Sequence, residues 1–70
     1  MKLSARNQLK GTVAGIEEGA VNGIVHLDIG AGHIISATIS MNAIQELGLQ
    51  PGKSAYAVIK ATSVMVGIDE

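Results

Sequence analysis

The chain has no cysteine, phenylalanine or tryptophan, and it has a single tyrosine, Tyr56. Without cysteine it can form neither a disulfide nor a thiolate metal site. Its core must be built from aliphatic side chains and methionine, which bury less area per residue than aromatics do. Proteins that bind single-stranded nucleic acids stack bases on aromatic side chains in a basic groove. The scarcity of aromatics and a formal net charge of −1 therefore argue against a nucleic-acid partner.

Long apolar runs are also missing. No stretch reaches the roughly 18 apolar residues from which a membrane-spanning helix is predicted. The first residues lack the continuous apolar segment and cleavage pattern of a secretory signal. With a pI of about 6.0, the chain has no polybasic patch that would draw it to a membrane surface. The sequence therefore predicts a cytoplasmic protein without a membrane partner.

The composition indicates self-association. A chain of 70 residues forms one small domain at most, which buries a modest fraction of its surface. Yet 47% of the residues are hydrophobic, more than one small core needs. Surplus apolar surface on a short chain is most readily covered by copies of the same chain. We therefore expect a homo-oligomer.

Hydrophobic periodicity predicts mainly strands. Apolar residues that recur with period 2, or in short runs bounded by glycine, favour strands over residues 9–16, 21–29 and 33–40. The spacing by three of Met41, Ile44 and Leu47 then predicts a short helix over residues 41–47, with Gly48 as its stop.

The last part of the chain returns to a strand-like pattern over residues 54–68. This pattern predicts two strands, or one bent strand broken near residues 61–63. In all, the sequence predicts an all-β fold: a small five-stranded OB-like Greek-key barrel with one short helix between strands 3 and 4. An open β-meander is the alternative.

Hydrogen-bond donors gather in three places. Near the start, Ser4, Arg6 and Asn7 offer a hydroxyl, a guanidinium and an amide, and the arginine fork suits anionic oxygens. Lys60 stands in a run that is apolar on both faces, so it must reach water or face an anion. Ser40 lies where a strand passes into the helix, a place for an N-cap and for N–H groups that favour anions. Taken separately, a solvated lead-in, a lysine that reaches solvent and a simple N-cap explain them at least as well.

Three segments together carry a family resemblance. They are Ser-Ala-Arg-Asn-Gln-Leu-Lys-Gly at the start, Ala-Thr-Ile-Ser followed by Leu-Gly-Leu-Gln-Pro-Gly in the middle, and Ala-Tyr-Ala-Val-Ile-Lys-Ala-Thr-Ser-Val near the end. In this order and spacing they resemble the molbindins, the small molybdate-binding Mop proteins. The same module resembles the C-terminal domains of molybdate-responsive regulators and of molybdate-importer ATPases. The resemblance covers almost the whole chain, so we expect residues 1–70 to be a single Mop domain.

The resemblance implies a homohexamer, a trimer of dimers, with oxyanions bound at subunit interfaces. Ser4 and Arg6 would come from one subunit, and its neighbour would supply Ser40, Lys60 and Ala61. Flanking contacts would come from Ala5, Asn7 and Thr62. One position departs from the family pattern, because two-module regulators carry an arginine where this chain has Glu46. A carboxylate cannot donate to a dianion, so Glu46 must point away or the site must differ there.

The residues fit the implied ligand. Molybdate is a tetrahedral dianion that offers only acceptor oxygens, so its site needs donors alone. The charges of Arg6 and Lys60 together match the charge of one molybdate. The sequence thus predicts a non-enzymatic binder of molybdate or tungstate for molybdenum storage and homeostasis. No organic cofactor is expected, because a pterin form of molybdenum, the minor variant, would want aromatic side chains for stacking.

Two other functions stay open. One is an OB-like nucleic-acid-binding module, which the fold class permits but the charge and the lack of aromatics oppose. The other is a purely structural oligomerisation domain, in which the donors only join subunits. An enzyme is the least favoured class, because no nucleophile–base pair and no paired carboxylates converge in the sequence, so no catalytic residue is assigned.

His26 and His33 fall on neighbouring strands of the expected hairpin, with Asp28 between them. Two histidines and a carboxylate raise the question of a metal site. No third convergent ligand is evident, so we expect outward-facing histidines and no metal.

Overall fold

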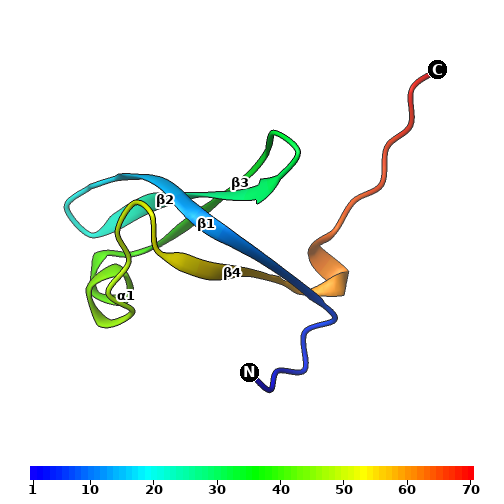
Figure 1. Cartoon of the computed structure of the whole chain (residues 1–70). Helices are drawn as coiled ribbons and strands as arrows, with labels where there is room; N and C mark the ends of the chain where they lie inside the picture. Colours follow the sequence, from blue (N-terminus) through cyan, green and yellow to red (C-terminus); the bar gives the residue numbers. More distant parts are fainter.

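The computed structural model describes all residues 1–70 and forms one curled antiparallel sheet with a short helix at one end (Figure 1). Its elements are β1 (Asn7–Glu17), β2 (Asn22–Gly30), β3 (His33–Ser40), α1 (Met41–Glu46), β4 (Ser54–Ile59) and a single 3-10 turn, η1 (Ala61–Ser63). The strand order is β3-β2-β1-β4. The first three expected strands and the helix are confirmed, with bounds shifted by one or two residues at most ends.

β1 is the central strand because it pairs with β2 on one side and with β4 on the other. The ladder with β2 is irregular between Val13 and Gly15, where a bulge leaves Ala14 without a partner. The bulge resets the alternation, so Val13 and Ile16 both turn toward the core although three positions separate them. The two strands also approach closely at Gly11, where a Cβ would lie 2.5 Å from the Asp28 carbonyl oxygen.

The core is small and lies on the concave side of the sheet. Only 6 of 70 residues are buried, which leaves most apolar side chains partly in contact with solvent. The buried hydrophobic residues are Val13, Val25, Leu27, Ile44 and Ala57. Gly23 makes room for the helix, because a Cβ there would lie 2.8 Å from the ends of Ile44 and Met41. Glycine in β2 thus lets α1 pack directly on the sheet.

The helix is short but capped at both ends. The Ser40 side chain accepts a hydrogen bond from the Ala43 N–H at 3.0 Å, as an N-cap does. At the other end, the Lys53 ammonium donates to the carbonyls of Leu47 and Gly48. A cation suits the C-terminal end of a helix, where carbonyls have no intrahelical partner.

The fifth strand was predicted wrongly. After η1, residues 64–70 form no strand and run away from the sheet (Figure 1). Val64 is 48% exposed, but Met65, Val66 and Ile68 are 94%, 92% and 86% exposed, so the segment beyond Val64 buries almost nothing in its own chain. The sheet is therefore a half-barrel: β3 and β4 are its two edges and are not paired with each other.

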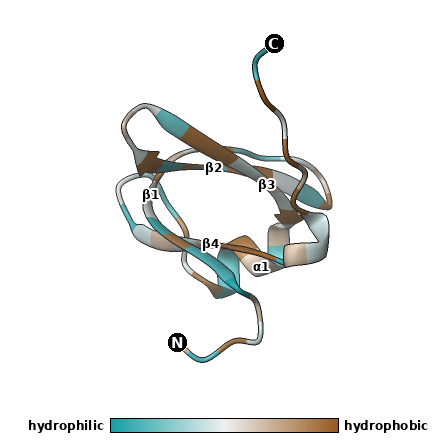
Figure 2. Ribbon diagram, turned by 90° about the vertical axis from the view of Figure 1, so that its right-hand side faces the viewer, coloured by the Kyte–Doolittle hydropathy of each residue, from teal (hydrophilic) through white to brown (hydrophobic).

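An apolar groove marks the open side of the half-barrel, and 13 of its 15 lining residues are hydrophobic. Apolar segments of β2, β3 and β4 surround this side (Figure 2). The groove runs between the two edge strands and is lined from both: Ile35, Ala37 and Ile39 on β3, and Ala55, Ala57 and Ile59 on β4. A fifth strand would have to lie here to close the barrel.

Candidate functional site

Pairing of β1 with β4 brings together the donor-rich segment near the start of the chain and the segment that carries Lys60. Asn7, the first residue of β1, lies opposite Ile59, the last residue of β4. The Asn7 side-chain amide also donates to the Ile59 carbonyl at 3.3 Å. Arg6 directly precedes this pair and Lys60 directly follows it, so the two cations leave the same end of the sheet. We call Ser4, Arg6, Lys60 and the 61–62 backbone the cation end.

The charges of the cation end have no internal partners. The only ion pair in the chain joins His26 to Glu17, so neither Arg6 nor Lys60 is paired with a carboxylate. Both residues are exposed. Unpaired cations side by side give this end a positive potential that attracts anions.

Backbone donors lie beside the cations. Within η1, the Ser63 N–H donates to the Lys60 carbonyl and the Val64 N–H to the Ala61 carbonyl. The N–H groups of Ala61 and Thr62 precede these bonds and make none within the chain. Because free backbone N–H groups next to cations are suited to anionic oxygens, Ala61 and Thr62 can serve through their main chain.

Ser40 lies at the opposite end of the sheet. It pairs with Asn22 at the start of β2, beside the residues that end β1. β1 is 11 residues long, and a strand of that length spans roughly 30 Å or more. One chain therefore does not bring Ser40 to Lys60, and Figure 1 shows α1 and η1 far apart. We call Ser40, α1 and the turn over residues 17–22 the helix end.

Three of the chain's carboxylates belong to the helix end. Glu17 and Glu18 follow β1, and Glu46 is the last residue of α1, exposed and without an ion pair of its own. Ser40 uses an oxygen lone pair as the N-cap, which leaves its hydroxyl hydrogen free to donate. This end alone offers a dianion one side-chain donor among negative charges, so it is no complete site.

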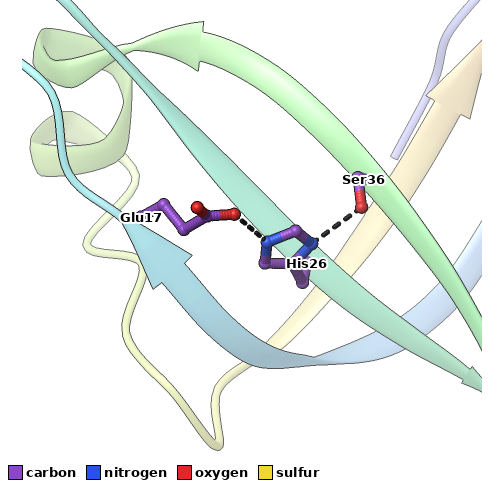
Figure 3. Close-up of polar contacts among 3 residues, drawn as sticks. All are labelled: Glu17, His26 and Ser36. Carbon is purple, nitrogen blue, oxygen red and sulfur yellow. Dashed lines mark hydrogen bonds and ion pairs between the residues drawn. The ribbon is translucent and has the colours of Figure 1, made fainter.

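A polar cluster crosses β1, β2 and β3 on the outer face of the sheet (Figure 3). The His26 Nε2 lies 2.6 Å from a Glu17 carboxylate oxygen, and its Nδ1 lies 2.7 Å from the Ser36 hydroxyl oxygen. Serine, histidine and glutamate in this order resemble an activated nucleophile. However, the cluster stands on an exposed sheet face, and neither the apolar groove nor the hollow beside the turn after β1 is lined by all three residues. The cluster acts as a cross-strand tie.

The positions of His26 and His33 bear on the question of a metal site. His26 faces outward and is engaged on both ring nitrogens. His33 is exposed at the start of β3, beside the hairpin turn. No three histidine or carboxylate side chains lie close enough together to hold a metal ion. Sequence reasoning missed the contact of Glu17 with His26, because the contact depends on the register shift in β1 between Val13 and Gly15.

Known proteins match the chain in sequence over nearly its full length. Residues 3–66 match the family model of the TOBE domain. A "probable molybdenum-pterin-binding protein" from Haemophilus influenzae is 64% identical over 69 residues, which cover 99% of this chain and 100% of that protein.

Solved structures match the fold as well. The apo form of MopII from Clostridium pasteurianum superimposes with a TM-score of 0.89 at 43% identity, covering 96% of this chain and 100% of MopII. ModG, described as a cytoplasmic molybdate-binding protein and solved with molybdate bound, superimposes with a TM-score of 0.93 at 51% identity. That match covers 99% of this chain and 49% of ModG. The chain thus belongs to the TOBE-domain family and, within it, to the molbindin (Mop) group.

Proposed function

We propose that this protein binds molybdate, or the similar tungstate, as a non-enzymatic store in molybdenum homeostasis. The observation that carries the proposal is the cation end, where Arg6 and Lys60 stand together without carboxylate partners. The molybdate-bound relative supports the choice of ligand. A dianion is matched by these two charges, and its oxygens accept from both side chains.

The other donors near these cations are also of the kinds that an oxyanion site needs. The Ser4 hydroxyl lies in the segment that carries Arg6, and the free N–H groups of Ala61 and Thr62 follow Lys60. No carboxylate lies within this set of residues, so nothing in it repels a dianion. The apolar groove is a poor alternative, because none of its 15 lining residues carries a charged side chain and 13 of them are hydrophobic.

A site that also includes Ser40 takes it from a different copy of the chain than Lys60. Ser40 and Lys60 stand at opposite ends of β1, so they cannot contact one anion within a subunit. The family resemblance grouped Ser40 with Lys60 on one subunit, apart from Arg6. The geometry of the single chain favours a different grouping, with Arg6 and Lys60 together and Ser40 contributed across an interface.

The assembly that we propose is a homo-oligomer, with the hexamer as the expected form. In an extended conformation, the segment after η1 would place Val64, Val66 and Ile68 on one side and Met65 and Gly67 on the other. It runs away from its own sheet (Figure 1), and none of its residues lines the groove of its own chain. A second copy offers an apolar groove between two unpaired strand edges, which such a segment can fill as the missing strand.

The proposal also covers location and extent. No helix of the chain is long and apolar enough to cross a membrane, and the ModG relative is described as cytoplasmic. We propose a cytoplasmic protein and a single Mop module over residues 1–70. Several relatives are named for a molybdenum pterin, but the only aromatic side chain is Tyr56 on β4, away from the cation end. The free oxyanion is therefore the proposed ligand.

Isothermal titration calorimetry tests the function directly. Sodium molybdate titrated into the purified oligomer should give saturable binding, and sodium sulfate should bind much more weakly, because sulfate is smaller while its charge and shape are the same. Nucleic acid is tested in parallel with a fluorescent single-stranded oligonucleotide. Absence of saturable molybdate binding would overturn the proposal, and an oligomer indifferent to every oxyanion would point to a structural module instead.

A further inference from the structure

The segment that carries Ser4 and Arg6 is held to the rest of the chain by very little. Residues 1–6 precede the first strand and contain two bends. None of their backbone groups takes part in a main-chain hydrogen bond outside the regular elements. The segment has one hydrogen bond to the rest of the chain, in which the Gln8 side-chain amide donates to the Ala5 carbonyl at 2.9 Å.

That bond lies where it can set the direction of both donors. Ala5 stands between Ser4 and Arg6 and is half-buried, whereas its two neighbours are exposed. Gln8 belongs to β1 and is paired with Val58 of β4, so its own position is fixed by the sheet. Because the Gln8 side chain is anchored by the sheet and bonds the Ala5 carbonyl, it limits how far Ser4 and Arg6 on either side can move.

Asn7 makes the corresponding tie on the other side of the cation end. Its amide nitrogen donates to the Ile59 carbonyl, one residue before Lys60. Neighbouring side chains of β1 thus reach in opposite directions, Gln8 back to the Ser4–Arg6 segment and Asn7 across to the strand that ends at Lys60. This use of its amide differs from the direct anion contact expected for Asn7.

We infer that Gln8, together with Asn7, is a positioning residue for the oxyanion site. It holds Ser4 and Arg6 in the orientation in which they and Lys60 can bind one anion. This inference rests on the proposed function. A site whose donors are already ordered does not lose their conformational freedom again when the ligand binds. Gln8 therefore raises affinity without touching the ligand.

The test replaces Gln8 by methionine, which has a similar length but no donor. The matched control is Gln50→Met, because Gln50 is an exposed glutamine in the turn before β4 whose side chain makes no hydrogen bond. Two readouts are taken on the intact oligomer. One is the dissociation constant for sodium molybdate by calorimetry, and the other is the backbone 15N–1H NOE of residues 3–6 without ligand.

If the binding-competent orientation falls to a tenth or a fifth of the population, Gln8→Met should weaken molybdate binding about fivefold to tenfold. The NOE values of residues 3–6 should fall in the same variant, while the melting temperature and the oligomer stay those of Gln50→Met. A merely structural role would lower the melting temperature and leave those NOE values unchanged.

The outcomes separate the inference from the function. If the unaltered protein binds molybdate and Gln8→Met binds it as tightly as Gln50→Met does, the inference is overturned and the function stands. If affinity falls without any change in the NOE values, positioning is again rejected, because Gln8 would then act by direct contact. If the unaltered protein does not bind molybdate, the proposed function fails first and the inference fails with it.

Discussion

The helix end and the cation end belong to the same sheet but differ in how far the chain satisfies its own groups. At the helix end, Ser40 caps α1, Lys53 covers the final carbonyls, and Ile44 is buried over Gly23. At the cation end, Arg6 and Lys60 have no ionic partner, and the segment that follows them is almost fully exposed.

This difference separates residues that stabilise the fold from residues that are left unpaired and can contact a ligand or another copy of the chain. An unpaired charge is stabilised by water until an anion replaces that water, whereas exposed apolar side chains are unfavourable in water and favour a partner that covers them. A group that is already capped or buried has little to gain. Apart from Ser40, which we propose to be contributed across an interface, we therefore expect changes at the helix end to alter stability, and changes at the cation end to alter assembly and anion binding.

The largest effect is expected from the apolar segment after η1. If it docks as a strand with Val64, Val66 and Ile68 inward, Val66→Asp places a charge in an apolar groove and should dissociate the oligomer. Burying one valine contributes about 1.5–3 kcal/mol, and burial of an unpaired carboxylate adds a larger penalty. Sedimentation velocity over a range of concentrations measures the change.

Met65→Asp is the matched control, since Met65 is exposed like Val66 but points to the other side of an extended segment. It should leave most of the assembly intact. If Val66→Asp and Met65→Asp dissociated the oligomer equally, or if neither did, strand-like docking would be contradicted. The contrast between a closed helix end and an open cation end would then be lost.

The next effect is the loss of anion binding in Arg6→Ala and in Lys60→Ala. Each removes a charge-assisted hydrogen bond, worth about 1.5–3 kcal/mol, so molybdate affinity should fall roughly 10-fold to 100-fold. The fold should persist, because neither side chain is buried or paired. Lys10→Ala, which removes an exposed lysine from within β1, serves as the control. Unchanged affinity in both test variants would disprove the site assignment.

The sequence predicts the features that depend on local periodicity and misses those that depend on which strands pair. Periodicity describes which face a side chain takes, so the strand over residues 33–40 was predicted with its observed bounds. Periodicity does not identify a pairing partner. The sequence alternates after Thr62, but no strand of this chain pairs with that segment, so the fifth strand was predicted wrongly.

The site shows the same limit. The family resemblance placed Ser4 and Arg6 on one subunit and Lys60 on its neighbour, whereas the register that sets Asn7 opposite Ile59 brings Arg6 and Lys60 to the same end of one chain. The distance of Ser40 from them depends on strand order, which no local pattern encodes. Gln8 was missed because its role depends on two bends before β1. The His26–Glu17 contact was missed because it depends on a bulge.

A smaller effect is expected at the helix end from Gly23→Ala. The added Cβ would lie 2.8 Å from the ends of Ile44 and Met41 and 3.0 Å from the Glu17 carbonyl oxygen. The two side chains can yield but the carbonyl resists, so unfolding should become easier by about 1–3 kcal/mol. Urea denaturation at one protomer concentration measures this.

Gly67→Ala provides the comparison for that variant, since no atom lies within 4 Å of a Cβ at Gly67. It should leave the denaturation midpoint nearly unchanged. If Gly23→Ala also weakened molybdate binding in the folded protein, the two ends would not be independent, and the contrast between them would have to be abandoned.

The smallest effect is expected from Ser36→Ala, which removes the partner of the His26 Nδ1 and leaves the Glu17 contact in place. Because the cluster is partly exposed, water can replace the lost hydroxyl, and the cost should be about 1 kcal/mol or less. Ser54→Ala, at an exposed strand serine without a side-chain hydrogen bond, is the matched control, and both are compared by their urea midpoints. An unchanged midpoint relative to that control would show that this contact contributes nothing to the closed helix end. A loss of several kcal/mol would instead mean that the outer face is covered in the assembly, because only desolvation gives one hydroxyl that much weight.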